Sequence, residues 1–570
     1  MQQSSFIFST DGIKKIYASG FLLLILVLFF YQIINGSYYG QRAQNNYVRL
    51  IPIPAIRGSI FDRNGNLLAY DRAIFNISVI PYQIKNKKDS LFEGLSKFSG
   101  YSLVTIKKNY LRNSKNPFSA VDIIKDIDKI TALELKEKFK DQILISPKPQ
   151  RYYPQQENSA HFIGYVKEAS THYEKLKKYG YKPLERVGFL GIEQYYDAYL
   201  KGQDGGDLIE VDARNRVVGF LGERRPKKGQ NIYLTIDNRI QELGFAALGK
   251  KKGVVILMNS INGEIIALCS APSFNSNSFI SGKNVSQLLT NKSSPLLNRA
   301  TQASYPIGST FKPLVALAAI EENKLNPDKT FLCEGKVMVG LAKFRCWETH
   351  GLQNLYQALT HSCNSYFYNL GLNLGPNALS RVAKQFGLDS PTGIDLPYEK
   401  NGFVPTLHWK KKTLKQNWYA GDTVNFSIGQ GFMNVTPLAN MLAINVFASD
   451  GYLIKPRILK KVGNLSSSLP SRTYLKYKKE FIKEIKKGLR GVVNNKGGTA
   501  SLLKNLNFEI SGKTGTAQTN GSPHGWFVGY FPYKESTYTI CVFLENGKSS
   551  YEALKVVYKF LKTIDEEELL

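Results

Sequence analysis

Three short polar segments stand in order along this chain of 570 residues, and their side chains suit serine acyl transfer. They are Ser309-Thr310-Phe311-Lys312, Ser362-Cys363-Asn364 and Lys513-Thr514-Gly515-Thr516. Each segment alone is short enough to arise by chance. Together they supply a nucleophile, a base, a proton relay and a cation for an anionic substrate. We therefore interpret them as parts of one active site.

The first segment places a hydroxyl and an amine one helical turn apart. The apolar residues after Gly308 recur at helical spacing, and Pro313 is tolerated only in a first turn, so a helix should begin near Ser309. Ser309 and Lys312 then share one helix face. A lysine acts as a base only if its pKa falls towards neutrality, which needs desolvation or a neighbouring cation, and Lys513 is the candidate for that cation. We expect Ser309 to be the nucleophile and Lys312 its base.

The third segment has the character of an edge strand that binds substrate. Gly515 lets a ligand backbone approach the strand closely. Lys513 and Thr514 are expected to bind a substrate carboxylate. The backbone N–H of Thr516 would complete an oxyanion hole with that of Ser309.

The middle segment lies between two helical stretches and offers two polar side chains. Ser362 supplies a hydroxyl that can relay protons, and Asn364 supplies an amide that can orient a peptide carbonyl. His361 is expected to be a helix-surface imidazole, whereas His524, just after the Lys513 strand, is a candidate for substrate contact. Taken singly, all these residues also have structural interpretations, such as helix capping or a solvated lysine.

Four further side chains have the chemistry of metal ligands. The set with the spacing C-x12-C-x3-H-x12-C is Cys333, Cys346, His350 and Cys363. Three thiolates and one imidazole make an acceptable closed tetrahedral zinc site, which would tie a loop to the middle catalytic segment. Disulfide bonds are the alternative, because an extracytoplasmic compartment favours them. Cys269 and Cys541 bring the total to five, so at least one cysteine stays unpaired in an oxidised monomer.

An apolar segment near the amino terminus is a candidate membrane anchor. Residues 16–34 carry no charge and are about long enough to cross a bilayer as a helix. A cleavable signal peptide is the alternative, but the run exceeds the usual h-region and no clear A-x-A site follows. Lys14 and Lys15 precede the span, which favours a cytoplasmic amino terminus, although Arg42 and Arg49 follow it. We expect a single-pass anchor with the rest of the chain outside the cytoplasm.

The chain is strongly basic, with a formal net charge of +30. A basic balance permits a nucleic-acid partner, but the sequence has no zinc-finger, RRM or helix-turn-helix pattern. We therefore expect no nucleic-acid partner. An anionic membrane surface or glycan layer is a better match for the charge.

Turn signals predict the sheet that positions the three segments. Asn262-Gly263 separates two apolar runs within residues 252–272, which is a strong hairpin signal, and a second hairpin spans residues 526–545. An antiparallel sheet built from these hairpins and the Lys513 strand, with helices on its faces, is the simplest assembly. The Ser309 helix would pack against it, and a helix at about residues 552–561 would end the chain. Asn64-Gly65 predicts a further hairpin near the amino terminus.

The whole pattern resembles the class B penicillin-binding proteins of the elongation type, penicillin-binding protein 2, which are the D,D-transpeptidases of rod-shaped growth. Besides the three segments, five stretches carry the resemblance: RGSIFDRNGNLLA (57–69), RYYPQQENSAHFIGYV (151–166), GFLGIEQYYD (188–197), NRATQASYPIGSTFKP (298–313) and WYAGDTVNFSIGQG (418–431). The resemblance covers nearly the whole chain. The Ser-x-x-Lys, Ser-x-Asn and Lys-Thr-Gly elements are those of penicillin-binding proteins and serine β-lactamases, whose acylating base is disputed.

The resemblance implies an α+β protein with a single N-terminal transmembrane helix, an elongated mixed α/β pedestal domain and a transpeptidase domain. The transpeptidase domain would be an antiparallel sheet flanked by helices, like that of serine β-lactamases. We expect a cytoplasmic tail at 1–15, the anchor at 16–35, the pedestal or dimerisation domain at 40–230 and the transpeptidase domain at 231–565.

The resemblance also implies the chemistry, the location and the partners. Ser309 would form an acyl-enzyme with a peptidoglycan stem peptide, Lys312 would deprotonate it, and β-lactams would acylate the same hydroxyl. The catalytic domain would lie in the periplasm of a bacterium, anchored in the inner membrane. A RodA-type glycan polymerase, the elongation complex and the membrane would be its partners. In such relatives the positions matching the Cys/His set look like a metal site, which favours zinc over disulfides.

Two other functions stay open. One is a non-catalytic protein that binds penicillin or wall peptides and regulates a glycan polymerase, although such a scaffold has no need for Ser309, Lys312 and Lys513 together. The other is a hydrolase, either a D,D-carboxypeptidase or a β-lactamase. The large membrane-proximal region favours wall synthesis, since hydrolysis needs only the catalytic fold.

Overall fold

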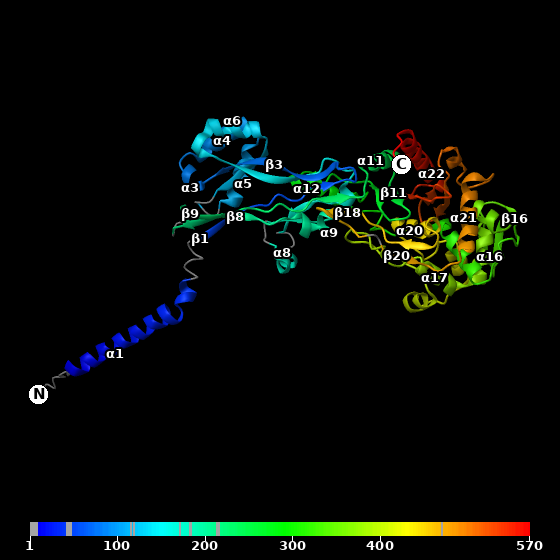
Figure 1. Cartoon of the computed structure of the whole chain (residues 1–570), viewed down its shortest axis with the longest axis horizontal. Helices are drawn as coiled ribbons and strands as arrows, with labels where there is room; N and C mark the ends of the chain where they lie inside the picture. The colour runs from blue at the N-terminus through cyan, green and yellow to red at the C-terminus, as the bar shows by residue number, and fades with distance from the viewer. Residues whose placement is uncertain are drawn as a thin grey trace. The chain divides into compact units, whose positions relative to one another are not determined.

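The computed structural model describes residues 10–40, 48–114, 117, 120–169, 173–181, 185–212, 217–468 and 471–570 (Figure 1). The chain divides into two compact units. The first contains residues 1–56, 72–150 and 202–228, and the second contains residues 57–71, 151–201 and 229–570. Two stretches of the membrane-proximal sequence, 57–71 and 151–201, thus belong to the unit that holds the catalytic segments.

The amino-terminal helix is long and apolar enough to cross a membrane. It consists of α1 (Thr10–Phe29) and a π-helical turn, η1 (Phe30–Ile34). The span Asp11–Ile34 has 24 residues, and its most apolar stretch of 18 residues has a mean hydropathy of 2.2 and is not buried against the rest of the protein. A bilayer core needs about 20 such residues, so the helix fits a single membrane span.

The first unit contains a small antiparallel sheet with strand order β1-β8-β9. These strands are β1 (Val48–Ile53), β8 (Gly205–Val211) and β9 (Val217–Arg224). A separate core forms where β4 (Val121–Ile127) pairs with the end of β3 (Leu67–Val79). The helices packed on that core are α4 (Lys88–Ser99), α5 (Leu103–Asn113) and α6 (Lys129–Phe139).

The hairpin expected at Asn64-Gly65 is confirmed. Strand β2 (Ile60–Phe61) pairs antiparallel with the start of β3, and the Asp62 N–H donates to the Asn66 carbonyl across the turn at 2.9 Å. Gly65 has φ +89°, a conformation that glycine adopts without strain. Strand β10 (Ile232–Leu234) runs parallel to β2 and connects the hairpin to the sequence of the catalytic domain.

A buried ion cluster fastens stretches 57–71 and 151–201 together. Glu193 on helix α9 (Gly191–Tyr195) accepts from the Nε atoms of Arg57 and Arg151, at 2.6 Å each. Arg57 also pairs with Asp197 at 2.6 Å, and Asp71 accepts from the Arg57 backbone N–H at 3.0 Å. These side chains are almost fully buried. Burial of so many charges is tolerable only because each carries several charge-assisted hydrogen bonds.

The catalytic unit is built on a five-stranded antiparallel sheet with strand order β12-β11-β23-β22-β21. Its strands are β11 (Gly253–Asn259), β12 (Ile265–Ala271), β21 (Ser511–Ala517), β22 (His524–Phe531) and β23 (Tyr538–Leu544). This is the sheet predicted from the two hairpins and the Lys513 strand. Strand β21 pairs only with β22 in this sheet, so the Lys513 strand lies at an edge.

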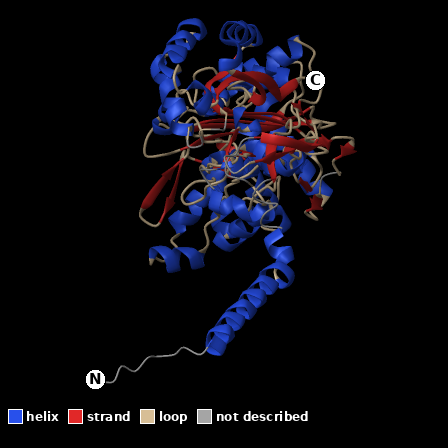
Figure 2. Ribbon diagram, turned by 90° about the vertical axis from the view of Figure 1, so that its left-hand side faces the viewer, coloured by secondary structure: helices blue, strands red, loops and turns tan. Residues whose placement is uncertain are grey.

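Helices cover both faces of this sheet, which explains why the residues of its strands are almost all buried (Figure 2). Alternate residues of β11 face opposite cores: Val254 packs in one hydrophobic cluster and Val255 in the other. Helices α11 (Asn238–Leu248) and α22 (Ser550–Glu566) cover one face. Helices α14 (Lys312–Glu321) and α20 (Pro437–Ala448) belong to the other core. The C-terminal helix, α22, is longer than the sequence predicts.

Four further helices of the catalytic unit contact α14: α15 (Leu355–Thr360), α16 (Asn364–Leu374), α17 (Pro376–Gln385) and α21 (Lys479–Asn494). Helix α19 (Ala420–Ser427) packs on α16 and α17. Two small hairpin-like pairs lie between α14 and α15. Their strands are β13 (Phe331–Cys333), β14 (Lys336–Val339), β15 (Ala342–Arg345) and β16 (Gly351–Gln353).

Candidate active site

The candidate nucleophile, Ser309, lies in a tight turn against the edge strand. The sequence predicts a helix from about Ser309, and the structure has one 3-10 turn, η5 (Gly308–Phe311), before α14 begins at Lys312. The Gly308 N–H donates to the Gly429 carbonyl at 2.9 Å, and the Thr310 hydroxyl donates to the Ile307 carbonyl at 2.9 Å. These bonds fix the turn that presents Ser309.

Lys312 is fully buried and joins the first segment to the second. Its Nζ atom donates to the Ser362 carbonyl at 2.7 Å, to the Asn364 Oδ1 atom at 2.7 Å and to the Ser362 hydroxyl at 3.2 Å. Burial lowers the pKa of Lys312 to about 8, against the opposing effect of the nearby Cys363 and Cys346 sulfurs. An appreciable fraction of the amine is therefore neutral near neutral pH, and the neutral amine is the form that can act as a base.

Ser362, Cys363 and Asn364 form the sharp turn between α15 and α16, as their helical flanks suggest. Ser362 has φ +52°, an uncommon conformation for a residue other than glycine. The Cys363 N–H donates to the Ala358 carbonyl at 2.9 Å, which holds the turn. Strained backbone of this kind is often retained at functional sites. Here it brings the Ser362 and Asn364 side chains to the Lys312 amine.

The third segment packs directly against the nucleophile turn. A Cβ atom added at Gly515 would lie 2.8 Å from the Ile307 carbonyl oxygen, and one at Gly308 would lie 3.1 Å from the Thr516 carbonyl oxygen. Only glycine permits so close an approach of the two backbones. The N–H groups of Ser309 and Thr516 thus belong to adjacent backbone segments, as an oxyanion hole requires.

Lys513 is fully buried on β21. Burial lowers the pKa of Lys513 well below its usual range, and the charge of Lys312 lowers it further. Of the two causes that the sequence allows for a low pKa of Lys312, burial or a neighbouring cation, burial is the one that lowers it in the structure. Because two buried positive charges repel one another, Lys312 and Lys513 are both protonated only when an anion binds beside them.

Thr499 is a site residue that the motifs do not reveal. Its hydroxyl lies 2.6 Å from the hydroxyl of Thr514, which is nearly buried. The exposed Thr516 uses its hydroxyl to accept from the Ser550 N–H at 3.1 Å. The sequence signal at Thr499 is the preceding pair Gly497-Gly498. This pair predicts a tight turn but does not predict that Thr499 contacts Thr514.

The two histidines near the motifs are held by structural contacts. His524 packs against the rings of Tyr305 and Phe543, and its Nδ1 atom accepts from the Asn546 N–H at 3.0 Å. His361 ends α15, and its Nδ1 atom lies 2.8 Å from the Gln353 side-chain oxygen. Both imidazoles are therefore already engaged by the protein.

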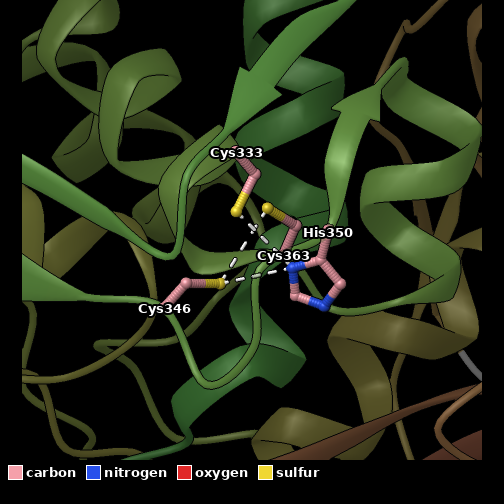
Figure 3. A group of neighbouring side chains, drawn as sticks. All are labelled: Cys333, Cys346, His350 and Cys363. Carbon is pink, nitrogen blue, oxygen red and sulfur yellow. Dashed lines mark hydrogen bonds between the residues drawn. The ribbon is translucent and has the colours of Figure 1, made fainter.

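The structure brings the four predicted metal ligands together (Figure 3). Their ligand atoms all lie within 4.8 Å of one another. The His350 Nδ1 atom is 3.5 Å from the Cys346 sulfur and 3.6 Å from the Cys333 sulfur, and the Cys346 and Cys363 sulfurs are 4.0 Å apart. A tetrahedral zinc site with Zn–S bonds of about 2.3 Å has sulfurs about 3.8 Å apart. The donor set and spacing fit that ion, and all five cysteines are free thiols.

The Cys/His cluster is connected to the catalytic turn. The Asn364 N–H donates to the Cys346 sulfur at 3.1 Å. A hydrogen bond with Cys363 and backbone N–H donors lower the pKa of Cys346 below its usual range, despite its partial burial. A thiolate at Cys346 is the form that binds metal ions. The cluster thus anchors the residue whose side chain contacts Lys312.

Comparisons with known proteins agree with this geometry. The family model for the penicillin binding protein transpeptidase domain matches residues 253–565, and that for the penicillin-binding protein dimerisation domain matches residues 52–234. The peptidoglycan D,D-transpeptidase MrdA of Haemophilus influenzae is 31% identical, over 95% of this chain and 90% of its own length. The MrdA protein of Escherichia coli is 30% identical, over 92% of this chain and 89% of its own length.

Solved structures show the same fold. Penicillin-binding protein 2 of Helicobacter pylori, in a complex with MreC, superimposes with a TM-score of 0.82 and 29% identity, covering 92% of this chain and 99% of that one. Penicillin-binding protein 2 of Pseudomonas aeruginosa gives a TM-score of 0.69 and 27% identity, covering 90% and 96%. The α+β architecture, the edge strand and the buried lysines agree with these comparisons. The chain therefore belongs to the penicillin-binding proteins, in the elongation-type group of peptidoglycan D,D-transpeptidases.

Proposed function

We propose that the chain cross-links peptidoglycan stem peptides by serine acyl transfer. The observation that carries this proposal is the buried Lys312 amine, which the structure places against Ser362 and Asn364 at the start of the helix after Ser309. A structural lysine would instead extend to solvent or pair with a carboxylate, because burial of an unpaired ammonium is costly.

The first half-reaction makes an acyl-enzyme. The Ser309 oxygen attacks the carbonyl carbon of the penultimate D-alanine, and the Lys312 amine takes the hydroxyl proton. The N–H groups of Ser309 and Thr516 stabilise the oxyanion. As the peptide bond breaks, the Ser362 hydroxyl passes a proton to the departing D-alanine amine and is reprotonated by Lys312. An ester to Ser309 remains.

The second half-reaction transfers the acyl group to an amine of a neighbouring stem peptide. The amine attacks the ester carbon, its proton passes back through the Ser362–Lys312 pair, and Ser309 leaves as a hydroxyl. Asn364 orients the peptide carbonyl during both steps. A β-lactam would acylate Ser309 in the same way as the donor peptide.

Substrate binding would set the protonation of the two lysines. A carboxylate near Lys513 and the hydroxyls of Thr514 and Thr499 favours the charged form of Lys513. Its charge then disfavours a proton on Lys312, which stays a neutral base. The donor peptide would in this way prepare the base that acts on it.

The proposal is tested by supplying the full chain, in detergent, with a stem pentapeptide donor and an amine acceptor. We expect release of D-alanine and formation of a cross-linked product, both absent in Ser309→Ala. Release of D-alanine without cross-linking would identify a D,D-carboxypeptidase. Neither product, from a folded chain, would favour the non-catalytic scaffold.

We propose that the catalytic unit works on the outer side of the inner membrane. The apolar amino-terminal helix and the two preceding lysines support this orientation. In this proposal residues 1–15 are cytoplasmic, 16–35 span the membrane, 40–230 form the pedestal and 231–565 the transpeptidase domain. A RodA-type glycan polymerase and the elongation complex would supply the strands, since a relative forms part of a peptidoglycan synthase complex.

We also propose one structural zinc ion held by the Cys/His cluster. Cys333, Cys346, His350 and Cys363 would fill all four tetrahedral positions, so the ion would take no part in the reaction. A closed site of this kind contributes folding energy. Its place beside Asn364 would hold the catalytic turn in register with Lys312.

A further inference from the structure

A basic face is exposed on the small hairpin that leads into the Cys/His cluster. Strands β14 and β15 pair antiparallel, with Lys336 opposite Arg345 and Met338 opposite Lys343. Residues on opposite strands at the same level share one face of a hairpin. The four side chains are all exposed, whereas Val337 and Phe344, on the other face, are partly buried. One face of the hairpin thus carries three cations.

These cations are not neutralised within the hairpin. Like charges directly opposite one another destabilise a strand pair, yet Lys336 faces Arg345. None of Lys336, Lys343 and Arg345 forms an ion pair with any residue that the structure describes, and the hairpin is described throughout. An anionic ligand would relieve this repulsion, so the arrangement is suited to binding one.

The hairpin is fixed to the wall of the active site. The Tyr368 hydroxyl donates to the Arg345 carbonyl at 3.2 Å, and Tyr368 lies one turn after Asn364 on α16. One turn of helix rises about 5.4 Å. Cys346, which follows Arg345 in the sequence, accepts a hydrogen bond from the Asn364 N–H. The basic face is therefore attached at two points to the helix that begins with a catalytic residue.

A second basic segment lies beside the hairpin. The ring of Phe344 lies 3.1 Å from the position of a Cβ atom on Gly421, at the start of α19. Next to Gly421, Asp422 pairs with the buried Lys410 at 2.5 Å. The segment that follows Lys410 is exposed and carries Lys411, Lys412 and Lys415. Lys411, Lys412 and Lys415 form no ion pair with any residue that the structure describes, and this positive segment adjoins the hairpin on the side of Phe344, opposite the basic face.

We propose that the basic hairpin face binds the carboxylates of the stem peptide that the active site uses. A stem peptide ends in a free carboxylate and carries further ones along its length, so it is a flexible polyanion. The terminal carboxylate of the donor is assigned to Lys513 on β21, whereas the hairpin is bonded to α16, the helix that begins with Asn364. The hairpin therefore binds the acceptor peptide, whose amine must reach the ester on Ser309. This inference rests on the proposed transpeptidase function and names the surface that selects its second substrate.

The test compares two variants that lose the same charge. Lys336→Gln, Lys343→Gln and Arg345→Gln are combined in one full-length chain. The matched control combines Lys250→Gln, Lys251→Gln and Lys252→Gln, which are exposed in a turn before β11. Acceptor dependence is measured as the KM and kcat for an anionic stem peptide acceptor and for the same peptide with its carboxylates amidated.

Each exposed charge contact changes a binding constant by about two- to threefold. We therefore expect the hairpin variant to raise the KM for the anionic acceptor about tenfold, with kcat unchanged, and to leave the KM for the amidated acceptor unchanged. The wild-type KM should rise with salt, because exposed charges are screened. The control variant should behave like the wild type. An unchanged KM in a folded hairpin variant overturns the proposal.

A lipid surface is the rival source of anionic groups. The same three chains, in detergent, are titrated with soluble short-chain phosphatidylglycerol, because the anchor helix would carry every full-length chain into a vesicle. Weaker binding of this lipid by the hairpin variant, with the acceptor KM unchanged, would assign the face to lipid and overturn the peptide proposal. Acylation of wild-type Ser309 by penicillin tests the proposed function separately, so a failure of the acceptor site is distinguishable from a failure of the enzyme.

Discussion

At the scale of single residues, the chemistry rests on two buried lysines with different neighbours. Lys312 contacts three oxygens of Ser362 and Asn364, and Lys513 lies on the strand that packs against the nucleophile turn. The Ser-x-x-Lys spacing predicts that Lys312 and Ser309 share one helix face, whereas the bonds from Lys312 to Ser362 and Asn364 depend on the fold. Thr499 was not predictable in this way, since its contact with Thr514 depends on how a glycine-rich turn folds back onto β21.

The rate of acylation should follow the protonation of Lys312. Burial lowers the pKa of this base to about 8, and only the neutral amine accepts the Ser309 proton. Below pH 8 the neutral fraction falls about tenfold per pH unit. We expect the second-order rate constant for penicillin acylation to rise with that slope from pH 6 and to level off above pH 8. A rate independent of pH from 6 to 9 would contradict the role of Lys312.

At the scale of elements, the site depends on how closely an edge strand approaches a helix start. The apolar runs and turn signals predict all five strands of the catalytic sheet, since strands covered by helices on both faces are recognisable from continuous apolar runs. The 3-10 turn before α14 and the positive φ of Ser362 were not predictable, because they arise from packing against Gly429 and α15 rather than from local propensity.

A side chain at Gly515 should separate the edge strand from the nucleophile turn. A Cβ atom there would lie 2.8 Å from the Ile307 carbonyl oxygen and 3.0 Å from the Thr310 methyl group. A displacement of about 1 Å can reduce a reaction rate a hundredfold. We expect Gly515→Ala to lower penicillin acylation by about ten- to a hundredfold. Gly521→Ala, where the nearest atom is 4.0 Å away, is the control and should acylate normally.

The Cys/His cluster should bind one zinc ion per chain. Metal content of the purified chain is measured by mass spectrometry after dialysis. Cys346→Ser should lose the metal and lower the unfolding temperature, because a closed zinc site contributes folding energy. Cys541→Ser, which removes a buried thiol on β23 away from the cluster, should keep it. A metal-free wild type of unchanged stability in chelator would refute the zinc proposal.

At the scale of the whole molecule, each compact unit is built from stretches that are separated in the sequence. Within the region 40–230, which the resemblance assigns to the pedestal, stretches 57–71 and 151–201 belong to the same compact unit as the catalytic segments. The reason is the buried cluster around Glu193, whose partners Arg57 and Arg151 are 136 and 42 residues away. Pairings at such separations leave no local signal, so they become visible only in the fold.

Removal of the charge at the centre of this cluster should destabilise the catalytic unit. Glu193→Gln removes the carboxylate charge that the two buried guanidinium groups share, and breaking a buried ion pair costs about 3–5 kcal/mol. We expect a clear fall in the thermal unfolding midpoint, measured by circular dichroism. Asp89→Asn, which breaks an exposed pair with Lys107, should leave the midpoint unchanged. Equal midpoints for the two variants would show that the Glu193 cluster contributes little.

The most direct measurement is covalent labelling of the full chain by a fluorescent penicillin, beside Ser309→Ala. Ser309 lies in the turn that directly precedes Lys312 and packs against the strand that carries Lys513. We predict one label per wild-type chain, located on the peptide that contains Ser309, and none on the variant. A folded wild type that takes no label, or a variant that labels equally well, would contradict the assignment of this site as a serine acyl transferase.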